Sequence, residues 1–541
     1  MNTHPVLIHE AIAQQAATRP GATAVISGVQ RLSYAELDAA ADKVAHALSE
    51  RGVTRGSVVP VILPRSAQLI TVLLGVLKCG AAYAAMDPSW PARRVHDLLQ
   101  TLDPPVLIAA ALSPMPSAVP VWSPPATWPA SASGAAPPTG MSDADPATVF
   151  FTSGTSGSPK AVLSPHRATT RLFRVHTHWW PVGGVVAQVA PASWDAFSLE
   201  VWGALLTGGT CVVHPSVHLL PAGLRTLVST ARVDTVFLTT SLFNFLVEED
   251  VDCLRGLRRV LIGGERLSVH HVRACMERHP LLRVSNCYGP VENCVFASVH
   301  AIDQQDCELA DGIPLGSAVP GTGIHVLHNG LPAGPGVTGE ICLSGDGLAL
   351  GYMTDPQLTA ERFPTVPIDG APRRIYRTGD LGRLDHEGRL HFRGRGDRQI
   401  KVAGHRVEPA EIEAAGRAVP GVRECAVLPV TESEGSVVRL AMFYVPVTST
   451  ASGEQGAGSP SAVRKALSAR LPRYLVPHLL RPCASFPLTA RGKVDSAALL
   501  ASLSSASRPV PDHEQGGVGD PAQFRRQGDE PKGTVAVSDV T

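Results

Sequence analysis

The segment Phe151–Ala161, FTSGTSGSPKA, combines hydroxyl side chains, glycines and one lysine in a short stretch. Glycines let the backbone curl so that several N–H groups face one point, and the hydroxyl groups and the lysine add further donors. Such a loop suits phosphate groups, although the Walker pattern G-x-x-x-x-G-K-[ST] is absent and an ordinary Ser/Gly loop is an equal alternative for this segment alone. The candidate phosphate ligands are Thr152, Ser153, Gly154, Thr155, Gly157 and Lys160.

Two groups of histidines suggest a metal site. His176 and His178 lie in the run HTHWW, and His270 is followed directly by His271. Further ligands at suitable spacing do not accompany either group, so a surface loop and a helix face are the better interpretations.

The elements that must position these side chains alternate along the chain. Short runs rich in Val and Ile, such as TAVISG, SVVPVIL, GTCVVHP, VDTVFLT and LRRVLIGG, predict buried and mostly parallel strands. Segments such as LHEAIAQQAATRP and SYAELDAAADKVAHALSERG carry apolar residues at helical spacing, and Ser33 with Glu36 predicts a capping box. The alternation indicates βα units, hence an α/β fold.

Three segments differ from this pattern. Residues 112–147 are rich in Pro, Ala and Ser and predict an extended loop, residues 505–541 predict a disordered tail, and Thr448–Pro460 predicts a loop. After Gly394 a short strand, a helix beginning near Glu408–Pro409 and another strand indicate a small α+β domain. We therefore predict a large domain over residues 1–394, a small one over 395–504 and a tail over 505–541.

Length and composition set the limits of these predictions. At roughly 150 residues per domain, 541 residues predict two to four domains, and a hydrophobic fraction of 44% excludes global disorder. Equal numbers of acidic and basic side chains, 47 of each, argue against a nucleic-acid binder and a polybasic membrane anchor. The longest apolar stretch, Ile70–Leu77, is too short to span a bilayer.

The N-terminus and the cysteines predict the compartment. The run MNTHPVLIHE lacks a basic region followed by an apolar stretch, so we expect no secretory signal. Ten cysteines are scattered without CxxC pairs, which fits reduced thiols better than disulfides or zinc. We expect a cytoplasmic protein.

Many separate blocks, in one order from about residue 8 to 500, resemble the adenylate-forming enzymes and, within them, the adenylation domains of nonribosomal peptide synthetases. The blocks are LSYAEL (Leu32–Leu37), LKCGAAYAAMDP (Leu77–Pro88), FTSGTSGSPK (Phe151–Lys160), NCYGPVE (Asn286–Glu292), GEICLSGDGLALGYMTDPQLTAERF (Gly339–Phe363), YRTGDL (Tyr376–Leu381), GRGDRQIKVAGHRVEPAEIE (Gly394–Glu413), LPRYLVP (Leu471–Pro477) and PLTARGKVD (Pro487–Asp495). The resemblance implies a large N-terminal domain of βα layers with mixed and parallel sheets plus a β-barrel-like subdomain, and a small mobile α+β C-terminal domain.

The resemblance also implies two half-reactions. An amino-acid carboxylate attacks the α-phosphorus of ATP, with Mg²⁺, and a phosphopantetheine thiol on a carrier protein then attacks the aminoacyl-adenylate. No carrier motif of the GG[DH]S type occurs after residue 500, so we expect an enzyme that loads a separate carrier protein. Many members of the family use a small MbtH-like activator protein, and this sequence does not decide whether it needs one.

Individual roles follow from the same resemblance. The Ser/Thr/Gly loop with Lys160 matches the residues that hold the β- and γ-phosphates. Glu292 matches a magnesium ligand, Tyr288 an adenine platform, Asp380 a ribose ligand and Arg395 a ribose or phosphate contact. Lys493 matches the catalytic lysine, which would bond both the substrate carboxylate and the phosphate. Asp397 matches the hinge about which the small domain rotates, opening a thiol tunnel near Gly404.

A further block, Trp194–Gly209, resembles the segment that carries the first specificity residues of the family. Asp195 matches the aspartate that pairs with the substrate α-ammonium, a helix-capping Asp being the alternative. The implied pocket lining is Asp195, Ala196, Leu199, Phe237, Leu261, Gly263, Cys287, Val295, Phe296 and Lys493. Since its side-chain end is apolar, we predict a branched aliphatic amino acid, with an aromatic or a β-modified aliphatic residue as alternatives.

Two departures qualify the resemblance. Ala161 stands where the family usually has Gly, and Val291 replaces the usual Thr. Apart from these departures, two other functions stay open: an acyl- or aryl-coenzyme A ligase, which should not need Asp195, and a non-catalytic binding protein built on the same fold.

Overall fold

The structure, a computed structural model, describes residues 7–110, 119–125, 140–154, 159–175, 177–430, 439–447, 457–489 and 494–505. The chain separates into two compact units, Met1–Phe486 and Pro487–Thr541. Among the described residues the second unit contains one helix, α13 (Ser496–Ser505). The first unit contains the other elements and is described below.

A nine-stranded sheet has the order β15-β14-β13-β12-β11-β9-β10-β1-β2, with parallel pairing from β1 through β10, β9, β11 and β12 to β13. Helices α7, α8 and α9 pack on one face through residues such as Leu224, Phe243 and Val272. The bounds are β1 (Thr23–Ser27), β2 (Gln30–Ser33), β9 (Val185–Gln188), β10 (Thr210–Val213), β11 (Thr235–Thr239), β12 (Arg259–Gly263), β13 (Arg283–Tyr288), β14 (Ser298–Ala301), β15 (Ser317–Ala318), α6 (Asp195–Leu206), α7 (Pro221–Ala231), α8 (Thr240–Asp250) and α9 (Val269–Arg278).

A seven-stranded sheet has the order β19-β8-β7-β4-β3-β5-β6. The largest core joins the two sheets through helices such as α2, α3 and α6, whereas α4 packs on another core with Val95 and Leu99. The bounds are β3 (Val58–Ile62), β4 (Ala82–Ala85), β5 (Leu107–Ala109), β6 (Val121–Trp122), β7 (Pro146–Thr152), β8 (Lys160–Pro165), β19 (Gly351–Tyr352), α1 (Ile8–Thr18), α2 (Tyr34–Ser49), α3 (Ala67–Lys78), α4 (Ala92–Leu102) and α5 (His166–Thr170).

A third, antiparallel sheet follows, with the order β17-β16-β18-β21-β20 and β22 paired to β21. It corresponds to the barrel-like subdomain that the resemblance implied. Its elements are β16 (Thr322–His328), β17 (Leu331–Pro332), β18 (Gly339–Gly345), α10 (Pro356–Arg362), β20 (Thr365–Ile368), β21 (Ala371–Leu384) and β22 (Leu390–Arg395).

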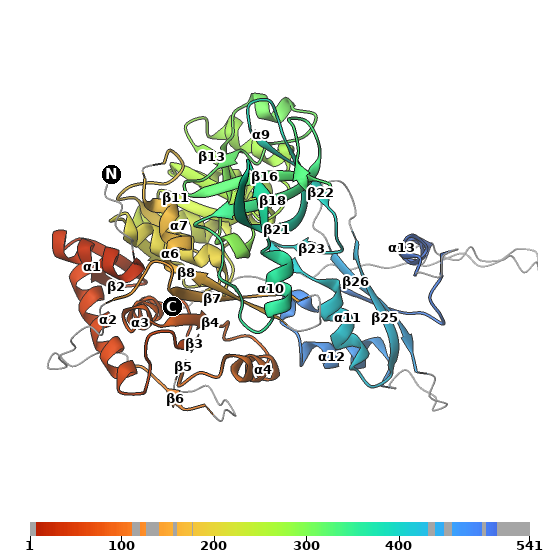
Figure 1. Cartoon of the computed structure of the whole chain (residues 1–541), viewed down its shortest axis with the longest axis horizontal. Coiled ribbons are helices and arrows are strands. Elements are labelled where there is room, and N and C mark those ends of the chain that lie inside the picture. The colour runs from red at the N-terminus through yellow and green to blue at the C-terminus, as the bar shows by residue number, and fades with distance from the viewer. Residues whose placement is uncertain are drawn as a thin grey trace, which may run out of the picture. The chain divides into compact units, whose positions relative to one another are not determined.

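The last part of the first unit is an α+β arrangement with its own core around Ile412, Met442 and Leu467. Figure 1 shows α11 and α12 beside β25 and β26. The elements are β23 (Ile400–Val402), β24 (His405–Val407), α11 (Pro409–Arg417), β25 (Val422–Val430), β26 (Arg439–Pro446), α12 (Pro460–Ser468) and β27 (Leu479–Pro482). Short 3₁₀ turns complete the first unit at η1 (Arg171–Phe173), η2 (Val251–Leu254), η3 (Val291–Asn293), η4 (Gln305–Glu308) and η5 (Arg473–Leu475).

The structure confirms the α/β fold class and the local signals behind it. All five Val- and Ile-rich runs are strands, namely β1, β3, β10, β11 and β12. The capping box is present, because the Ser33 side chain accepts from the Glu36 backbone and the Glu36 carboxylate accepts from Ser33 N. The helix expected near Glu408–Pro409 is α11, with Pro409 at its first turn, where the missing N–H has no intrahelical partner to lose.

The predicted division of the chain at residue 394 differs from the division by contacts, which falls after Phe486. Residues 395–486 belong to the first compact unit because charged side chains such as Arg406 and Glu411 are buried against the preceding part of the chain. The functional boundary at 394 stays a prediction. Within the Pro-rich segment 112–147, Val121–Trp122 forms β6 and Pro146 begins β7. The predicted tail, apart from Ser505, lies outside the described residues.

Candidate nucleotide and amino-acid site

The predicted phosphate loop joins two antiparallel strands. Thr152 ends β7 and faces Lys160, the first residue of β8, in the strand register. Thr152, Ser153 and Lys160 are all buried. The hydroxyl oxygen of Thr152 has no hydrogen-bond partner among the described residues. Gly154 is also described, whereas Thr155 and Gly157 lie outside the described residues.

Residues 404–411 contact this loop from the C-terminal side of the chain. Ser153 Oγ donates to the carbonyl of Arg406 at 2.7 Å and accepts from Glu408 N at 3.0 Å. Gly154 N donates to Glu411 Oε2 at 3.2 Å, and Lys160 Nζ lies 3.9 Å from Glu408 Oε1. Two carboxylates therefore occupy positions at the loop that suit anions.

Glu411 is held in place by a buried ion pair. Arg94 Nη1 in α4 donates to Glu411 Oε1 at 2.7 Å, and the two side chains are only 4% and 2% exposed. Because removing one member of a buried pair leaves the other charge uncompensated, this pair favours the packing of residues 404–411 on the loop.

Glu292, the predicted magnesium ligand, is fully buried in the turn after β13. Its Oε1 accepts from the Tyr352 hydroxyl at 2.9 Å and its Oε2 accepts from Arg406 Nη1 at 2.7 Å. Burial alone would raise the pKa of Glu292, but the Arg406 guanidinium, with help from Tyr352 and Lys160, holds it below its ordinary value. The side chain is therefore a carboxylate, as a ligand of a hard cation must be.

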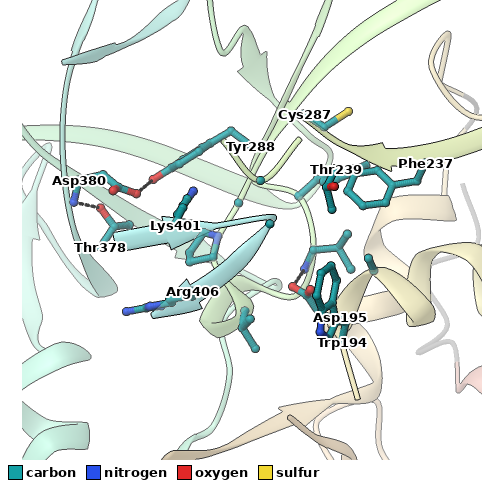
Figure 2. A pocket seen from close by; sticks show the side chains of 18 of the residues that line it. Trp194, Asp195, Phe237, Thr239, Cys287, Tyr288, Thr378, Asp380, Lys401 and Arg406 are labelled. Carbon is teal, nitrogen blue, oxygen red and sulfur yellow. Dashed lines mark hydrogen bonds between the residues drawn. The ribbon is translucent and has the colours of Figure 1, made fainter. Parts of the chain in front are cut away.

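The predicted adenosine ligands form a connected group. The Tyr288 hydroxyl at the end of β13 donates to Asp380 Oδ2 at 2.7 Å, as Figure 2 shows. Arg395 in β22 faces Asp380 in the strand register and donates to its other oxygen. Arg395 also binds both oxygens of Asp397, the predicted hinge residue, at 2.8 Å. Burial would raise the pKa of Asp397, but Arg395 outweighs it and lowers the pKa.

One pocket, part of it open to solvent, joins these ligands to the predicted amino-acid site. Figure 2 shows Asp195 and Phe237 on one side of it and Tyr288 and Asp380 on the other. The predicted residues that line it are Asp195, Ala196, Phe237, Cys287, Tyr288, Val295, Phe296, Asp380 and Arg395. The predicted adenosine ligands and the predicted amino-acid ligands therefore line one cavity.

Asp195 is the first residue of α6, and Trp194 holds the cap position, so Asp195 is not the capping residue. Its Oδ2 accepts from Val295 N at 3.0 Å. Burial raises the pKa of Asp195 to about 6, and the nearby Glu292 adds to this rise, while the backbone N–H groups oppose it. A buried carboxylate with a raised pKa is a natural partner for a ligand cation, which would stabilise its charged form.

The wall next to Asp195 is apolar and aromatic. The ring centres of Phe237 and Phe296 lie 5.7 Å apart. Trp179, which is outside the pocket, packs on Phe296 with 6.0 Å between the ring centres. Val295 and the preceding Cys294 have φ angles of 66° and 47°, in the left-handed region that non-glycine residues rarely adopt. For a β-branched residue this conformation is strained and needs support from its surroundings.

Other predicted residues do not line the pocket. Leu199 is buried in the core on α6, and Leu261 lies in β12. Gly263 packs against β13, where an added Cβ would lie 2.5 Å from the carbonyl oxygen of Cys287. The neighbouring Gly264 lines the pocket instead. Lys493 lies outside the described residues, so its predicted role stays a prediction.

Some lining residues were not among the predicted ligands. They include Thr239, Thr378, Gln399, Lys401 and Arg406. Lys401 Nζ lies 6.0 Å from the centre of the Tyr288 ring, and burial lowers the pKa of this lysine. Lys401 and Arg406 come from the hairpin β23–β24, inside the block GRGDRQIKVAGHRVEPAEIE. The sequence block therefore contained both residues, but it does not indicate which strands their side chains would contact.

The two departures from the family pattern have different settings. Ala161 is buried in β8 and is not among the residues with positive φ, so its methyl group is tolerated there. Val291 lines the pocket at the start of η3.

His271 has structural partners, since its Nδ1 is 2.7 Å from Ser268 Oγ and its Nε2 is 2.6 Å from Glu248 Oε1. In the other group, HTHWW, Trp179 and Trp180 are buried, and His176 lies outside the described residues. Within the described ranges no group of three or more His, Cys, Asp or Glu is placed to hold a metal ion. In the same ranges no helix has both the length and the apolar character needed to cross a membrane.

Known proteins resemble the chain over most of its length. A family model described as AMP-binding enzyme matches residues 12–353, and one described as AMP-binding enzyme C-terminal domain matches residues 411–493. A linear gramicidin synthase from Brevibacillus parabrevis is 36% identical over 91% of this chain, and tyrocidine synthase 3 of the same organism is 35% identical over 91%. The chain spans only 6% and 8% of the length of these two synthases.

Solved structures agree with this result. PA1221, described as an NRPS protein containing adenylation and PCP domains, is 34% identical with a TM-score of 0.82, covering 94% of this chain and 98% of that one. An artificially fused NpsA-ThdA adenylation-PCP di-domain from Klebsiella oxytoca is 26% identical with a TM-score of 0.78, covering 89% and 94%. The chain belongs to the AMP-binding enzyme family and, within it, to the adenylation domains of nonribosomal peptide synthetases.

Proposed function

We propose that this chain activates an apolar α-amino acid with ATP and passes it as a thioester to the phosphopantetheine arm of a carrier protein. The observation that carries the proposal is the single pocket that joins buried Asp195 to Tyr288 and Asp380. Asp195 would pair with the α-ammonium group of the substrate. An acid without that group would leave a buried carboxylate unpaired, which is costly.

The residues present fit a magnesium–triphosphate group. Glu292 supplies an ionised carboxylate, and the Thr152 hydroxyl supplies a buried oxygen without a partner among the described residues. Ser153 and Lys160 would bind the phosphates beside them. Bound there, Mg²⁺ would offset the negative charge of the phosphates.

In the first half-reaction the pocket holds the amino acid and the nucleotide in one orientation. A carboxylate oxygen attacks the α-phosphorus, a new P–O bond forms, and the bond to pyrophosphate breaks. We assign to Lys493 the stabilisation of the negative charge that builds up where the carboxylate meets the α-phosphate. Asp380 and Tyr288 would hold the adenosine through its ribose and its base.

In the second half-reaction the carrier thiol attacks the acyl carbon. The C–S bond forms, the bond between the acyl carbon and the bridging phosphate oxygen breaks, AMP leaves with that oxygen and the bonding electron pair, and the thiol proton passes to solvent. We assign Asp397 as the hinge between the two arrangements, with the thiol entering near Gly404, which lines the pocket. The partner is supported by related structures that contain adenylation and PCP domains together. An MbtH-like protein is a further candidate partner.

The side chain of the substrate would contact an apolar wall. Ala196, Val295 and Phe296 line the pocket next to Asp195, with Phe237 beside them. This lining supports a branched aliphatic amino acid, with aromatic and β-modified aliphatic residues as the next choices. Hydrophobic pockets separate such side chains by only about 1–3 kcal/mol per methylene, so selectivity must be measured.

The test is ATP–pyrophosphate exchange across the proteinogenic amino acids, benzoate and octanoate, with and without an added MbtH-like protein. We expect exchange with one or a few apolar amino acids and none with benzoate or octanoate. Turnover only with acids that lack an amine would indicate a coenzyme A ligase. Nucleotide binding without exchange for any acid would indicate a non-catalytic homologue. The matched control is Asp195→Asn, which keeps the shape of the side chain and removes its charge.

A further inference from the structure

Arg171, in the 3₁₀ turn η1, carries a buried cation. Its side chain is 1% exposed, and no acidic group lies within ion-pair distance of it among the described residues. Burial lowers the pKa of Arg171 only to about 10, so the guanidinium keeps its charge at neutral pH. Burying a charge without a counter-ion is unfavourable unless hydrogen bonds replace its hydration.

Those hydrogen bonds come mostly from one short segment. The five N–H groups of the guanidinium meet five acceptors, which are Thr322 Oγ1 and the carbonyl oxygens of Ala168, Asn293, Cys294 and Phe296. The bonds to Asn293 and Phe296 are 2.8 and 2.6 Å long. The carbonyl groups of Asn293, Cys294 and Phe296 thus all point toward the Arg171 guanidinium.

This segment is the strained part of the pocket wall. Cys294 and Val295 have positive φ, and a β-branched residue such as Val295 is disfavoured there. Glycines make room for the arrangement, since a Cβ on Gly289 would lie 2.2 Å from Val295 O and a Cβ on Gly347 would lie 2.6 Å from Arg171 Cζ. The guanidinium supplies the fixed set of donors that a strained turn requires.

With its carbonyls held by Arg171, the turn directs other groups into the pocket. Val295 N donates to Asp195 Oδ2 at 3.0 Å, and the side chains of Val295 and Phe296 line the cavity. We propose that Arg171 is a positioning residue for amino-acid selectivity, which fixes the wall next to Asp195 without touching the substrate. This inference rests on the proposed function.

Three variants test it. Arg171→Met keeps the length and removes the donors, Arg171→Lys keeps the charge but offers fewer and differently placed donors, and Arg174→Met is the matched control. Arg174 is 31% exposed and pairs with Asp143 and Asp346, so its loss should leave the turn unchanged. The readout is kcat/KM in pyrophosphate exchange for leucine, isoleucine, valine and phenylalanine, together with KM for the best amino acid and Kd for AMP.

We expect Arg171→Met to lower the ratio between the best and second-best amino acids by about ten-fold, with a raised KM for the best one and an unchanged Kd for AMP. Arg171→Lys should fall between the wild type and Arg171→Met, and Arg174→Met should match the wild type. Wild-type selectivity in a folded Arg171→Met protein would overturn the inference. Equal losses in amino-acid and AMP binding would also overturn it, since they would indicate a merely structural role.

A second variant covers the case in which Arg171→Met does not fold. Gly347→Ala leaves Arg171 in place, but its methyl group would lie 2.6 Å from Arg171 Cζ and 2.5 Å from Asn293 Oδ1. It therefore presses on both the guanidinium and the turn that the guanidinium holds, and selectivity should fall in the same direction. Hydrogen–deuterium exchange gives a readout apart from activity: amides of residues 293–297 should exchange faster in Gly347→Ala. Unchanged exchange and selectivity there would contradict the inference. Failure of the proposed function would look different, because the wild-type protein would then activate no amino acid.

Discussion

Arg406 Nη1 lies 2.7 Å from Glu292 Oε2, so that a guanidinium binds the carboxylate to which we assign magnesium. The two residues are 114 positions apart in the chain. Close by, the Glu411 carboxylate accepts the Gly154 N–H of the phosphate loop. The Arg406 guanidinium thus binds the carboxylate that we assign to magnesium. The Glu411 carboxylate likewise binds a backbone N–H group, that of Gly154, which we assign to the phosphates. With these assignments, residues 404–411 would compete with magnesium–ATP for the same groups.

Weakening this competition should tighten triphosphate binding. Glu411→Gln keeps the side-chain shape but removes the charge that pairs with Arg94, so residues 404–411 should leave the loop more easily. The apparent affinity of a ligand is reduced by the fraction of molecules that cannot accept it, and we therefore expect the Kd of magnesium and α,β-methylene-ATP to fall by about two- to ten-fold. Isothermal titration calorimetry would measure it.

Two controls accompany this measurement. Arg398→Ala breaks the pair between Arg398 and Glu413, in which the arginine is 65% exposed, and should leave the affinity unchanged. AMP lacks the β- and γ-phosphates, so its Kd should not respond to Glu411→Gln. Weaker triphosphate binding by a folded Glu411→Gln protein would show that Glu411 supports the site and does not compete with it.

The sequence predicted the fold and several residues that line the pocket for physical reasons that are local. Val- and Ile-rich runs favour buried strands, and the Ser33–Glu36 box needs only one helical turn. Tyr288 and Glu292 share a block and therefore stay together in the structure. The contacts of Arg406 with Glu292, of Glu411 with Arg94 and of Arg171 with residues 293–296 join positions more than a hundred residues apart, and no local pattern indicates such distances. Val295 gives no sign of its positive φ, because its side chain favours an extended backbone.

Amino-acid binding should depend on the ionisation of Asp195. Burial raises its pKa to about 6, so in the free protein the carboxylate loses its charge as the pH falls through that value. An ammonium group needs the charged form, and we expect KM for the amino acid to rise by about ten-fold per pH unit below the pKa. In Asp195→Asn the KM should be high and independent of pH over this range. A wild-type KM that stays constant from about pH 5 to 7.5 would remove Asp195 from the ammonium site.

Lys493→Ala should separate the two half-reactions. Loss of a cation at the developing charge typically lowers the rate by at least about 100-fold, so pyrophosphate exchange should fall by that amount or more. Thioester formation from chemically prepared aminoacyl-adenylate should persist, because the assigned role belongs to the first step alone. Lys465→Ala, at an exposed position of α12, is the control and should keep full exchange activity. Undiminished exchange in Lys493→Ala would refute the assignment.

Glu200 should make the stability of the protein depend on pH. This fully buried side chain of α6 accepts from Val189 N at 3.0 Å and Ala190 N at 2.9 Å, yet burial dominates and raises its pKa from 4.5 to about 8. A raised pKa means that the folded protein binds the proton more tightly. The stabilisation is therefore complete below the unfolded value and is lost as the pH rises through the folded value.

Between those two values this one group should lower the free energy of unfolding by about 1.4 kcal/mol per pH unit, and Glu200→Gln should remove that contribution. Urea unfolding of both proteins at a series of pH values gives the difference between their stabilities. We expect the free energy of unfolding of Glu200→Gln to increase relative to that of the wild type as the pH rises toward 8, because the wild type must then bury a charge. Glu249→Gln, at an exposed position of α8, should follow the wild type throughout. Parallel curves for Glu200→Gln and the wild type would mean that Glu200 stays ionised in the folded protein, with its two backbone donors outweighing burial.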